Sequence, residues 1–240
     1  MHYVLFMAIV AVSFIIEGLV GFGGNLIALP LANLYLPMRV AVPALTIVSL
    51  VIAIVRVCQR WRAISRPDYL KIMAGMLIGL PLGMLLLGYL PEKALKMFLG
   101  IAMIIVGIKG LYEIFRGTKK DEAPKRKWLL LVALLLGGIL QGAFACGGPF
   151  VVIYATAILK DKDSFTATLF AIWLTTNSLI TVKDFCVGNL TPEVLLLVLV
   201  SLPAIAIALG ISGWISKRLD GEKFSSVVYG ILIVAGFLMV

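Results

Sequence analysis

The sequence is a succession of apolar runs of about 20 residues, separated by short polar breaks. A helix of about 20 apolar residues crosses the roughly 30 Å hydrocarbon core of a bilayer. Backbone groups surrounded by lipid must find hydrogen bonds inside their own segment, so helices are expected there. The composition agrees, because 62% of the residues are hydrophobic and only 14% are charged. We therefore predict an all-α integral membrane protein.

The net charge of +9 does not indicate a nucleic-acid partner. Of the 21 Lys and Arg residues, 12 lie in two stretches, Arg56 to Lys71 and Lys109 to Lys127. Such clusters are typical of cytoplasmic loops that face anionic lipid. The three cysteines are far apart and form no C-x-x-C motif, so we expect no disulfide framework, no metal site and no cofactor.

A polar linker at mid-chain divides the sequence into two similar parts. The linker, residues 116–127, separates residues 1–115 from residues 128–240, and we predict that each part is one membrane repeat. An ungapped alignment places Gly18, Gly23 and Gly24 on Gly142, Gly147 and Gly148. Further on, prolines and glycines keep the same order with small shifts. A ladder of glycines at 75, 79 and 83 is expected to pack one helix closely against another.

The distribution of basic residues predicts how the repeats are oriented. If the first two apolar segments of each half form a hairpin, 17 basic residues lie inside and 4 outside. If they form one kinked span, the numbers are 13 and 8. The positive-inside rule favours hairpins, and the arms of about 14 and 12 residues would each be too short to span. We predict two inverted repeats, each a broken re-entrant hairpin plus three transmembrane helices, in the inner (plasma) membrane with both termini outside.

Each predicted hairpin is broken at a Gly-Gly pair, in EGLVGFGGNLIALP (residues 17–30) and QGAFACGGPFVVIY (residues 141–154). Irregular backbone at membrane depth is tolerated only where it is buried in protein or lines a wet cavity. We expect a new half-helix to begin at Asn25 and at Pro149, directly after the glycines. A helix start has unpaired N–H groups and a partial positive charge, which attract anions. Two such starts meeting near the midplane would bind a small anion, as in transporters with inverted repeats.

These two stretches together resemble the paired glycine motifs of the sulfite exporter TauE/SafE family, also called the toluene sulfonate uptake permease family. The resemblance covers essentially the whole chain, including the basic linker. It implies export or uptake of small sulfur-containing anions, such as sulfite, thiosulfate or sulfonated carboxylates. The second motif departs from the expected glycine-rich pattern at Ala143, Ala145 and Cys146.

Several residues are candidates for the binding site, and each also has a structural interpretation. Asn25 can donate to an anion or stabilise the half-helix start, and Cys146 can meet a sulfur substrate or fill space. Asn177 and Thr175 can bind an anion or join helices by hydrogen bonds. The predicted substrate-binding residues are Gly23, Gly24, Asn25, Cys146, Gly147, Gly148, Pro149, Thr175 and Asn177.

Charged candidates raise the same choice. Glu17 can couple transport to protons, by being neutral when desolvated and ionised when wet, or can cap the amides of the turn. Gln141 is its neutral counterpart in the second half. Arg56 and Lys183 can attract an anion towards the site or extend to the lipid headgroups.

The leading hypothesis is a secondary transporter, not an enzyme, for a small sulfur-containing anion. No Walker motif accompanies it, so an ion gradient or the membrane potential would supply the energy. One alternative is a thiol redox carrier that uses Cys146 and Cys186, and another is a channel-like membrane subunit. The expected partners are the anion and membrane lipid, without nucleic acid, and a homodimer is one option for the assembly.

Overall fold

The computed structural model describes residues 2–115, 127–159 and 161–215, and the single residues 230, 233, 236 and 237. Every regular element within these residues is a helix. In chain order they are α1 (His2–Val20), α2 (Gly24–Ala32), α3 (Met38–Arg60), the short 3-10 helix η1 (Trp61–Ala63), α4 (Arg66–Tyr89), α5 (Glu92–Phe115), α6 (Lys127–Phe144), α7 (Gly148–Ile158), α8 (Lys162–Val187) and α9 (Pro192–Ile215). Most of the predicted linker and most of the last predicted apolar segment lie outside the described residues.

Five stretches of the described chain are long and apolar enough to cross a membrane. They are His2–Leu19, Met38–Ala63, Arg66–Leu86, Lys162–Val187 and Pro192–Trp214. Large apolar side chains on their outer faces are exposed, for example Ile78 on α4 and Leu199 on α9. The prediction of an all-α membrane protein is therefore confirmed, and the chain passes the membrane several times.

The first helix differs from its predicted length. We expected about 14 residues, but α1 has 19 and a length of about 28 Å, so the argument that neither arm of the hairpin can span is wrong for this arm. The helix continues past Glu17 and ends at Val20, and the N–H of the next residue, Gly21, still donates to the Glu17 carbonyl at 2.7 Å. By contrast α2 and α7 have 9 and 11 residues, which is far too short to cross.

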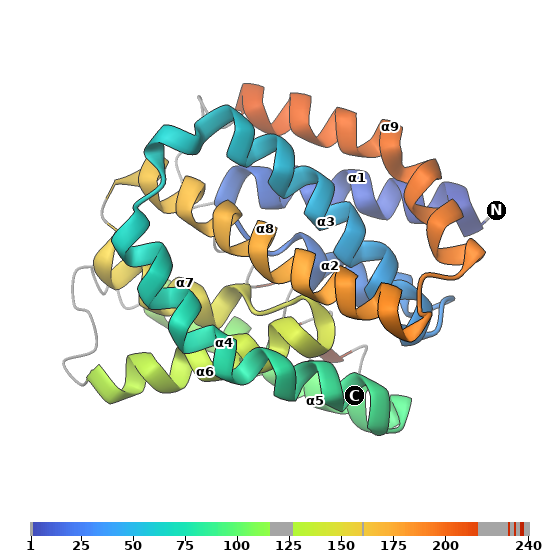
Figure 1. Ribbon diagram of the computed structural model, residues 1–240, viewed down its shortest axis with the longest axis horizontal. Coiled ribbons are helices and arrows are strands. Elements are labelled where there is room, and N and C mark those ends of the chain that lie inside the picture. Colours follow the sequence, from blue (N-terminus) through green and yellow to red (C-terminus); the bar gives the residue numbers. More distant parts are fainter. Residues whose placement is uncertain are drawn as a thin grey trace.

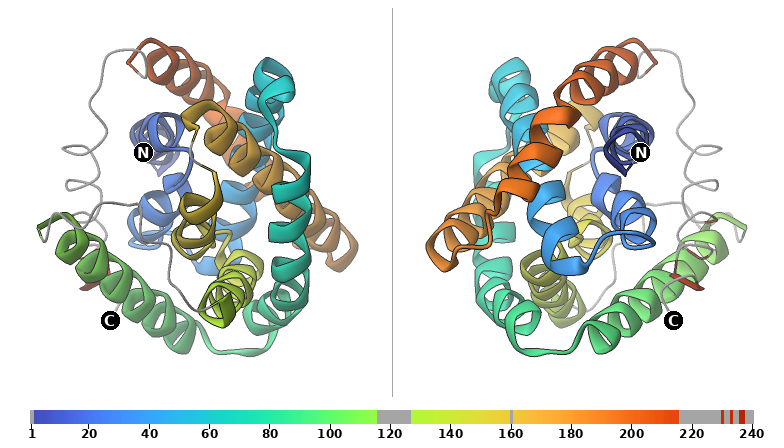
Figure 2. Two further views of the ribbon diagram at one scale, coloured as in Figure 1. Left: turned by 90° about the vertical axis from the view of Figure 1, so that its left-hand side faces the viewer. Right: turned by 90° about the vertical axis from the view of Figure 1, so that its right-hand side faces the viewer.

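The helices of the two halves are interleaved (Figure 1). Helix α1, the first of the first half, packs along α9, the fourth of the second half. In the same way α6, the first of the second half, packs along α4, the fourth of the first half. Between these pairs, α3 packs along α8, and the two run in opposite directions. Figure 2 shows α2 and α7 near the middle of the molecule, and nearly all residues of α2 are buried. A duplicated chain would give this packing pattern.

Glycines bring α4 and α6 into backbone contact. A Cβ atom added at Gly79 would meet the carbonyl oxygen of Leu135, and one added at Gly138 would meet that of Met76. Gly83 and Gly142 face carbonyl oxygens across the same interface. The predicted packing role of the glycine ladder is therefore confirmed.

Candidate functional site

Two turns in the interior carry the glycine motifs. The first, between α1 and α2, contains Gly21 and Gly23 with φ angles of 90° and 101°, which glycine adopts without strain. The second, between α6 and α7, contains Ala145 with φ 53°, the only described residue other than glycine with a positive φ. Gly21 and Ala145 occupy matching positions in the repeat alignment. The half-helices begin at Gly24 and Gly148, each one residue before the predicted start.

Matching side chains cap an amide at the start of each half-helix, the first residue of α2 and the residue before α7. Oε2 of Glu17 accepts a hydrogen bond from the N–H of Gly24 at 2.8 Å. Oε1 of Gln141 accepts one from the N–H of Gly147 at 2.9 Å. Both side chains are buried. Glu17 therefore caps an amide of the turn, and the expectation that both amides are free is wrong.

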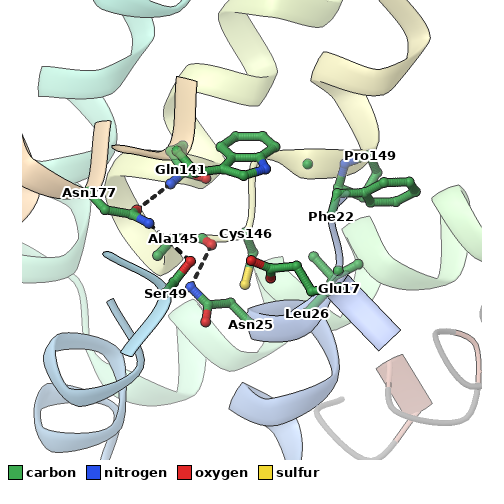
Figure 3. A pocket seen from close by; sticks show the side chains of 13 residues that line it. Glu17, Phe22, Asn25, Leu26, Ser49, Gln141, Ala145, Cys146, Pro149 and Asn177 are labelled. Carbon is green, nitrogen blue, oxygen red and sulfur yellow. Dashed lines mark hydrogen bonds between the residues drawn. The ribbon is translucent and has the colours of Figure 1, made fainter. Parts of the chain in front are cut away.

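The two turns face each other across a small gap (Figure 3). Nδ2 of Asn25, from the start of α2, donates to the carbonyl oxygen of Ala145 at 3.0 Å. The indole N–H of Trp173, from α8, donates to the carbonyl oxygen of Gly21 at 2.9 Å. Gly148 lies against the ring of Phe22. The start of α2 is therefore joined directly to the turn that precedes α7.

A chain of side-chain hydrogen bonds connects the second turn to α8 and α3. Nε2 of Gln141 donates to Oδ1 of Asn177 at 2.8 Å, and Nδ2 of Asn177 donates to Oγ of Ser49 at 3.1 Å. All three residues are buried. Asn177 thus links α6, α8 and α3 at one level of the molecule.

Residues from both halves line one small cavity at this level (Figure 3), with a volume of about 20 Å³. Its lining includes eight predicted site residues: Glu17, Gly23, Asn25, Gln141, Cys146, Gly148, Pro149 and Asn177. It also includes residues that the sequence interpretation missed: Phe22, Leu26, Ser49, Ala145 and Trp173. A serine within the aliphatic run of α3 is a signal of the same kind as Asn177 in α8, and it could have identified Ser49.

The remaining predicted site residues lie outside this lining. Gly24 and Gly147 do not line the cavity, but their amides bind the side chains of Glu17 and Gln141, which do. Thr175 points to α4, where its hydroxyl is 2.7 Å from the hydroxyl of Tyr69. This contact fits the alternative in which Thr175 joins helices.

The two basic candidates are also outside the lining. Arg56 is buried, so extension to the headgroups is wrong for this residue, and its guanidinium donates to the hydroxyl of Ser212 on α9. Nζ of Lys183 forms an ion pair with Oδ1 of Asp184 at 2.6 Å. Both positive charges are therefore held by neighbouring groups at the ends of helices.

The cavity is polar but contains little charge. Among the described residues that line it, Glu17 is the only Asp or Glu, and there is no Lys, Arg or His. Cys146 is buried in the second turn, whereas Cys186 is exposed near the end of α8, and both are free thiols. No cluster of three His, Cys, Asp or Glu side chains that could hold a metal ion occurs in the described part of the chain.

Comparison with known families agrees with the glycine motifs. The chain matches the family described as sulfite exporter TauE/SafE over residues 5–239, nearly its whole length. No curated protein and no solved structure matches it. Membership of this family implies membrane transport of sulfur-containing anions such as sulfite. The chain, which includes both glycine turns, therefore belongs to the sulfite exporter TauE/SafE family.

Proposed function

We propose that this protein is a secondary transporter, operating as an exporter, of a small sulfur-containing anion such as sulfite, thiosulfate or a sulfonate. The observation that carries the proposal is the cavity between the two broken helices, which is lined by residues of both halves. Such a cavity at the junction of two repeats is where secondary transporters bind their substrates. If the anion leaves the cell without a coupled ion, an inside-negative potential makes its export favourable by about 2.3 kcal/mol per charge per 100 mV.

The anion binds beside the second turn. The start of α7 carries a partial positive charge, and the amide of Gly147 is held only by the neutral oxygen of Gln141. An anionic oxygen is the stronger acceptor and can replace Gln141 there. At the start of α2, the amide of Gly24 already binds the carboxylate of Glu17, which repels a second anion. Cys146 and Asn177 complete the proposed anion site.

The proposed orientation is that of inverted repeats in the inner membrane, with both termini outside. Nη1 of Arg60, at the end of α3, forms an ion pair with Oδ1 of Asp163 at 2.6 Å, at the start of α8. The loops after α3 and before α8 therefore lie on the same side of the molecule. If each pair of broken segments were one kinked span, these loops would lie on opposite sides. The ion pair thus supports the hairpin arrangement, and the positive-inside rule assigns this side to the cytoplasm.

Flux through proteoliposomes tests the proposed substrate and site. Purified protein should catalyse counterflow of sulfite, thiosulfate or a sulfonate, and plain carboxylates should compete weakly. Asn177→Leu removes a polar group from the cavity and should reduce this flux at least tenfold, about 1.4 kcal/mol or more. Ser178→Ala is the matched control, because the Ser178 hydroxyl bonds to the Leu174 carbonyl of its own helix. Equal loss in both variants, or no flux of any of these anions, would contradict the proposal.

The orientation has an independent test. Cysteine tags placed at both termini should react with an impermeant thiol reagent in intact cells. A tag placed in residues 116–126 should be protected until the membrane is opened. Protection of both termini would reject the proposed inverted arrangement without affecting the flux assay.

A further inference from the structure

Two hydrogen-bond acceptors on the first-half side of the cavity have no partner. They are Oε1 of Glu17 and Oδ1 of Asn25, both buried, and both residues line the cavity. Each residue is 4% exposed. Glu17 is held in place through its other oxygen, which binds the amide of Gly24. Asn25 is held through its Nδ2, because the Ala145 carbonyl that it contacts can only accept a hydrogen bond. The orientation of both side chains is therefore set, and both residues line the same cavity with one buried acceptor left over.

The side-chain N–H donors that line the cavity already have acceptors, and the hydroxyl of Ser49, which interacts with Glu17, is a single donor for two acceptors. Nε2 of Gln141 donates to Asn177, and Nδ2 of Asn177 donates to Ser49. The indole N–H of Trp173 donates to the Gly21 carbonyl. A buried acceptor without a partner is costly, and a buried carboxylate more so. One hydroxyl can satisfy only one of these two oxygens and cannot neutralise a carboxylate, so the partner still missing is a positive charge or a proton from outside the chain.

The ionisable groups that face Glu17 come from two places. Arg56 of α3 interacts electrostatically with Glu17, but its guanidinium donates hydrogen bonds to Ser212 and Gln59. Cys146, in the second turn, is the other ionisable group close enough to interact. Helix α2 contains no ionisable side chain, and the only one on α9, Glu193, lies at the opposite end from Ser212. None of these groups forms an ion pair with the free oxygen in the described structure.

An anion in the same cavity makes the missing charge more important. Two negative charges about 5 Å apart, at an effective dielectric constant of about 20, weaken binding by on the order of 100-fold. A single positive charge on Glu17 removes this repulsion. Binding of the cation and of the anion should therefore strengthen each other to the same extent.

We propose that Oε1 of Glu17 and Oδ1 of Asn25 form the site of one coupling cation, a proton or Na⁺, which is bound and carried together with the anion. This inference rests on the proposed function and adds its coupling. The first turn then binds the cation, and the second turn binds the anion. A monovalent anion and its cation cross with no net charge, so the membrane potential does not drive them. Export then requires an outward gradient of the anion that is larger than the inward gradient of the cation.

The test uses proteoliposomes loaded with methanesulfonate, whose charge is the same at every pH used. With the potential held at zero, a gradient of either pH or Na⁺ should drive its accumulation by the unmodified protein, and the gradient that succeeds identifies the cation. Glu17→Gln should lose this accumulation and retain methanesulfonate counterflow. Its accumulation of methanesulfonate should instead respond to the potential, and the ratio of inside to outside concentration at equilibrium should change about 50-fold per 100 mV. Asp163→Asn, a carboxylate-to-amide change far from the cavity, should behave as the unmodified protein.

Two outcomes overturn the coupling site while leaving the transporter intact. In one, the unmodified protein catalyses counterflow but neither gradient drives accumulation. In the other, the Glu17→Gln protein still accumulates methanesulfonate in response to the gradient. Absence of counterflow of sulfite, thiosulfate and methanesulfonate in the unmodified protein rejects the proposed function itself. If Glu17→Gln does not fold, the unmodified protein in detergent still decides the question. Its affinity for methanesulfonate should fall at least tenfold when the identified cation is withdrawn, and an unchanged affinity would reject the site.

Discussion

The two glycine turns have the same kind of side-chain cap but a different charge. In each, the residue at the matching position of the preceding helix reaches across and caps an amide at the start of the half-helix. In the first turn that residue is the acid Glu17, and in the second it is the neutral Gln141. The common hydrogen bond explains why the position is polar in both halves. The difference in charge divides the cavity into a side suited to cations and a side suited to anions.

Making the two turns alike should have the largest effect. Gln141→Glu places a second carboxylate beside the start of α7, where we propose that the anion binds. Repulsion of about 3 kcal/mol, for charges about 5 Å apart at an effective dielectric constant of about 20, should weaken anion binding on the order of 100-fold. Counterflow and equilibrium binding of methanesulfonate measure the loss.

The control for this change is Gln141→Met, which has a similar size and loses the hydrogen bond to Gly147 without adding charge. It should weaken binding far less than Gln141→Glu. If both variants lose binding equally, the effect comes from the lost cap, and charge does not distinguish the two turns.

The interfaces that support the turns also differ between the halves. The α4–α6 contact is made through glycine, so a Cβ atom at Gly79 would press on the Leu135 carbonyl. Gly79→Ala should separate the two backbones and lower the free energy of unfolding by about 2 kcal/mol. Gly210→Ala, on α9, is the matched control, because nothing lies within 4 Å of its added Cβ.

Thermal unfolding in detergent measures both alanine variants. The helix propensity of alanine should make Gly210→Ala neutral or stabilising by up to about 1 kcal/mol. Equal destabilisation of the two variants would show that the α4–α6 interface is no tighter than the outer face of α9.

The hydrogen-bonded chain on the side of the second turn should give a smaller effect. Asn177→Ala leaves Nε2 of Gln141 without its closer acceptor and Oγ of Ser49 without its donor. Buried groups left without partners should cost about 2 kcal/mol of unfolding free energy, whereas Ser49→Ala should cost about 1 kcal/mol. The double variant should cost less than the sum of the two, because they share one hydrogen bond. Strict additivity in thermal unfolding would show that the chain does not act as a unit.

The sequence predicted the class of the fold and the two turns because these depend on local patterns. Apolar run length indicated the spanning helices, and the Gly-Gly pairs indicated the turns to within one residue. The length of α1 was not predictable in the same way. Glu17 and Gly18 look like the end of an apolar helix, but the buried cap formed by the Glu17 side chain lets the helix continue to Gly21.

Contacts between distant segments explain the other differences. Ser49 stands out as a serine in an aliphatic run, but it meets Asn177 only because α3 packs on α8. Trp173 has no such signal, and only the fold shows that its indole reaches the Gly21 carbonyl. Arg56 looks like a residue at the end of a span, yet Ser212 from α9 holds it inside the protein. The repeat alignment related the two halves, but only the fold shows which groups of one half contact the other.

The smallest expected effect concerns the backbone of the turns. Ala145 has a left-handed φ of 53°, at the position where the first turn has Gly21 with φ 90°. An alanine in this region costs about 1 kcal/mol, but glycine gains a similar amount of freedom in the unfolded chain. Ala145→Gly should therefore change the unfolding free energy by less than about 0.5 kcal/mol, whereas Gly21→Ala should lower it by about 1 kcal/mol. The added methyl group at Gly21 meets the side chains of Leu169 and Thr166 only at ordinary contact distance, so backbone strain alone is tested. Chemical denaturation in detergent measures both, and a large loss in Ala145→Gly would mean that the methyl group of Ala145 packs in a way that the first turn does not require.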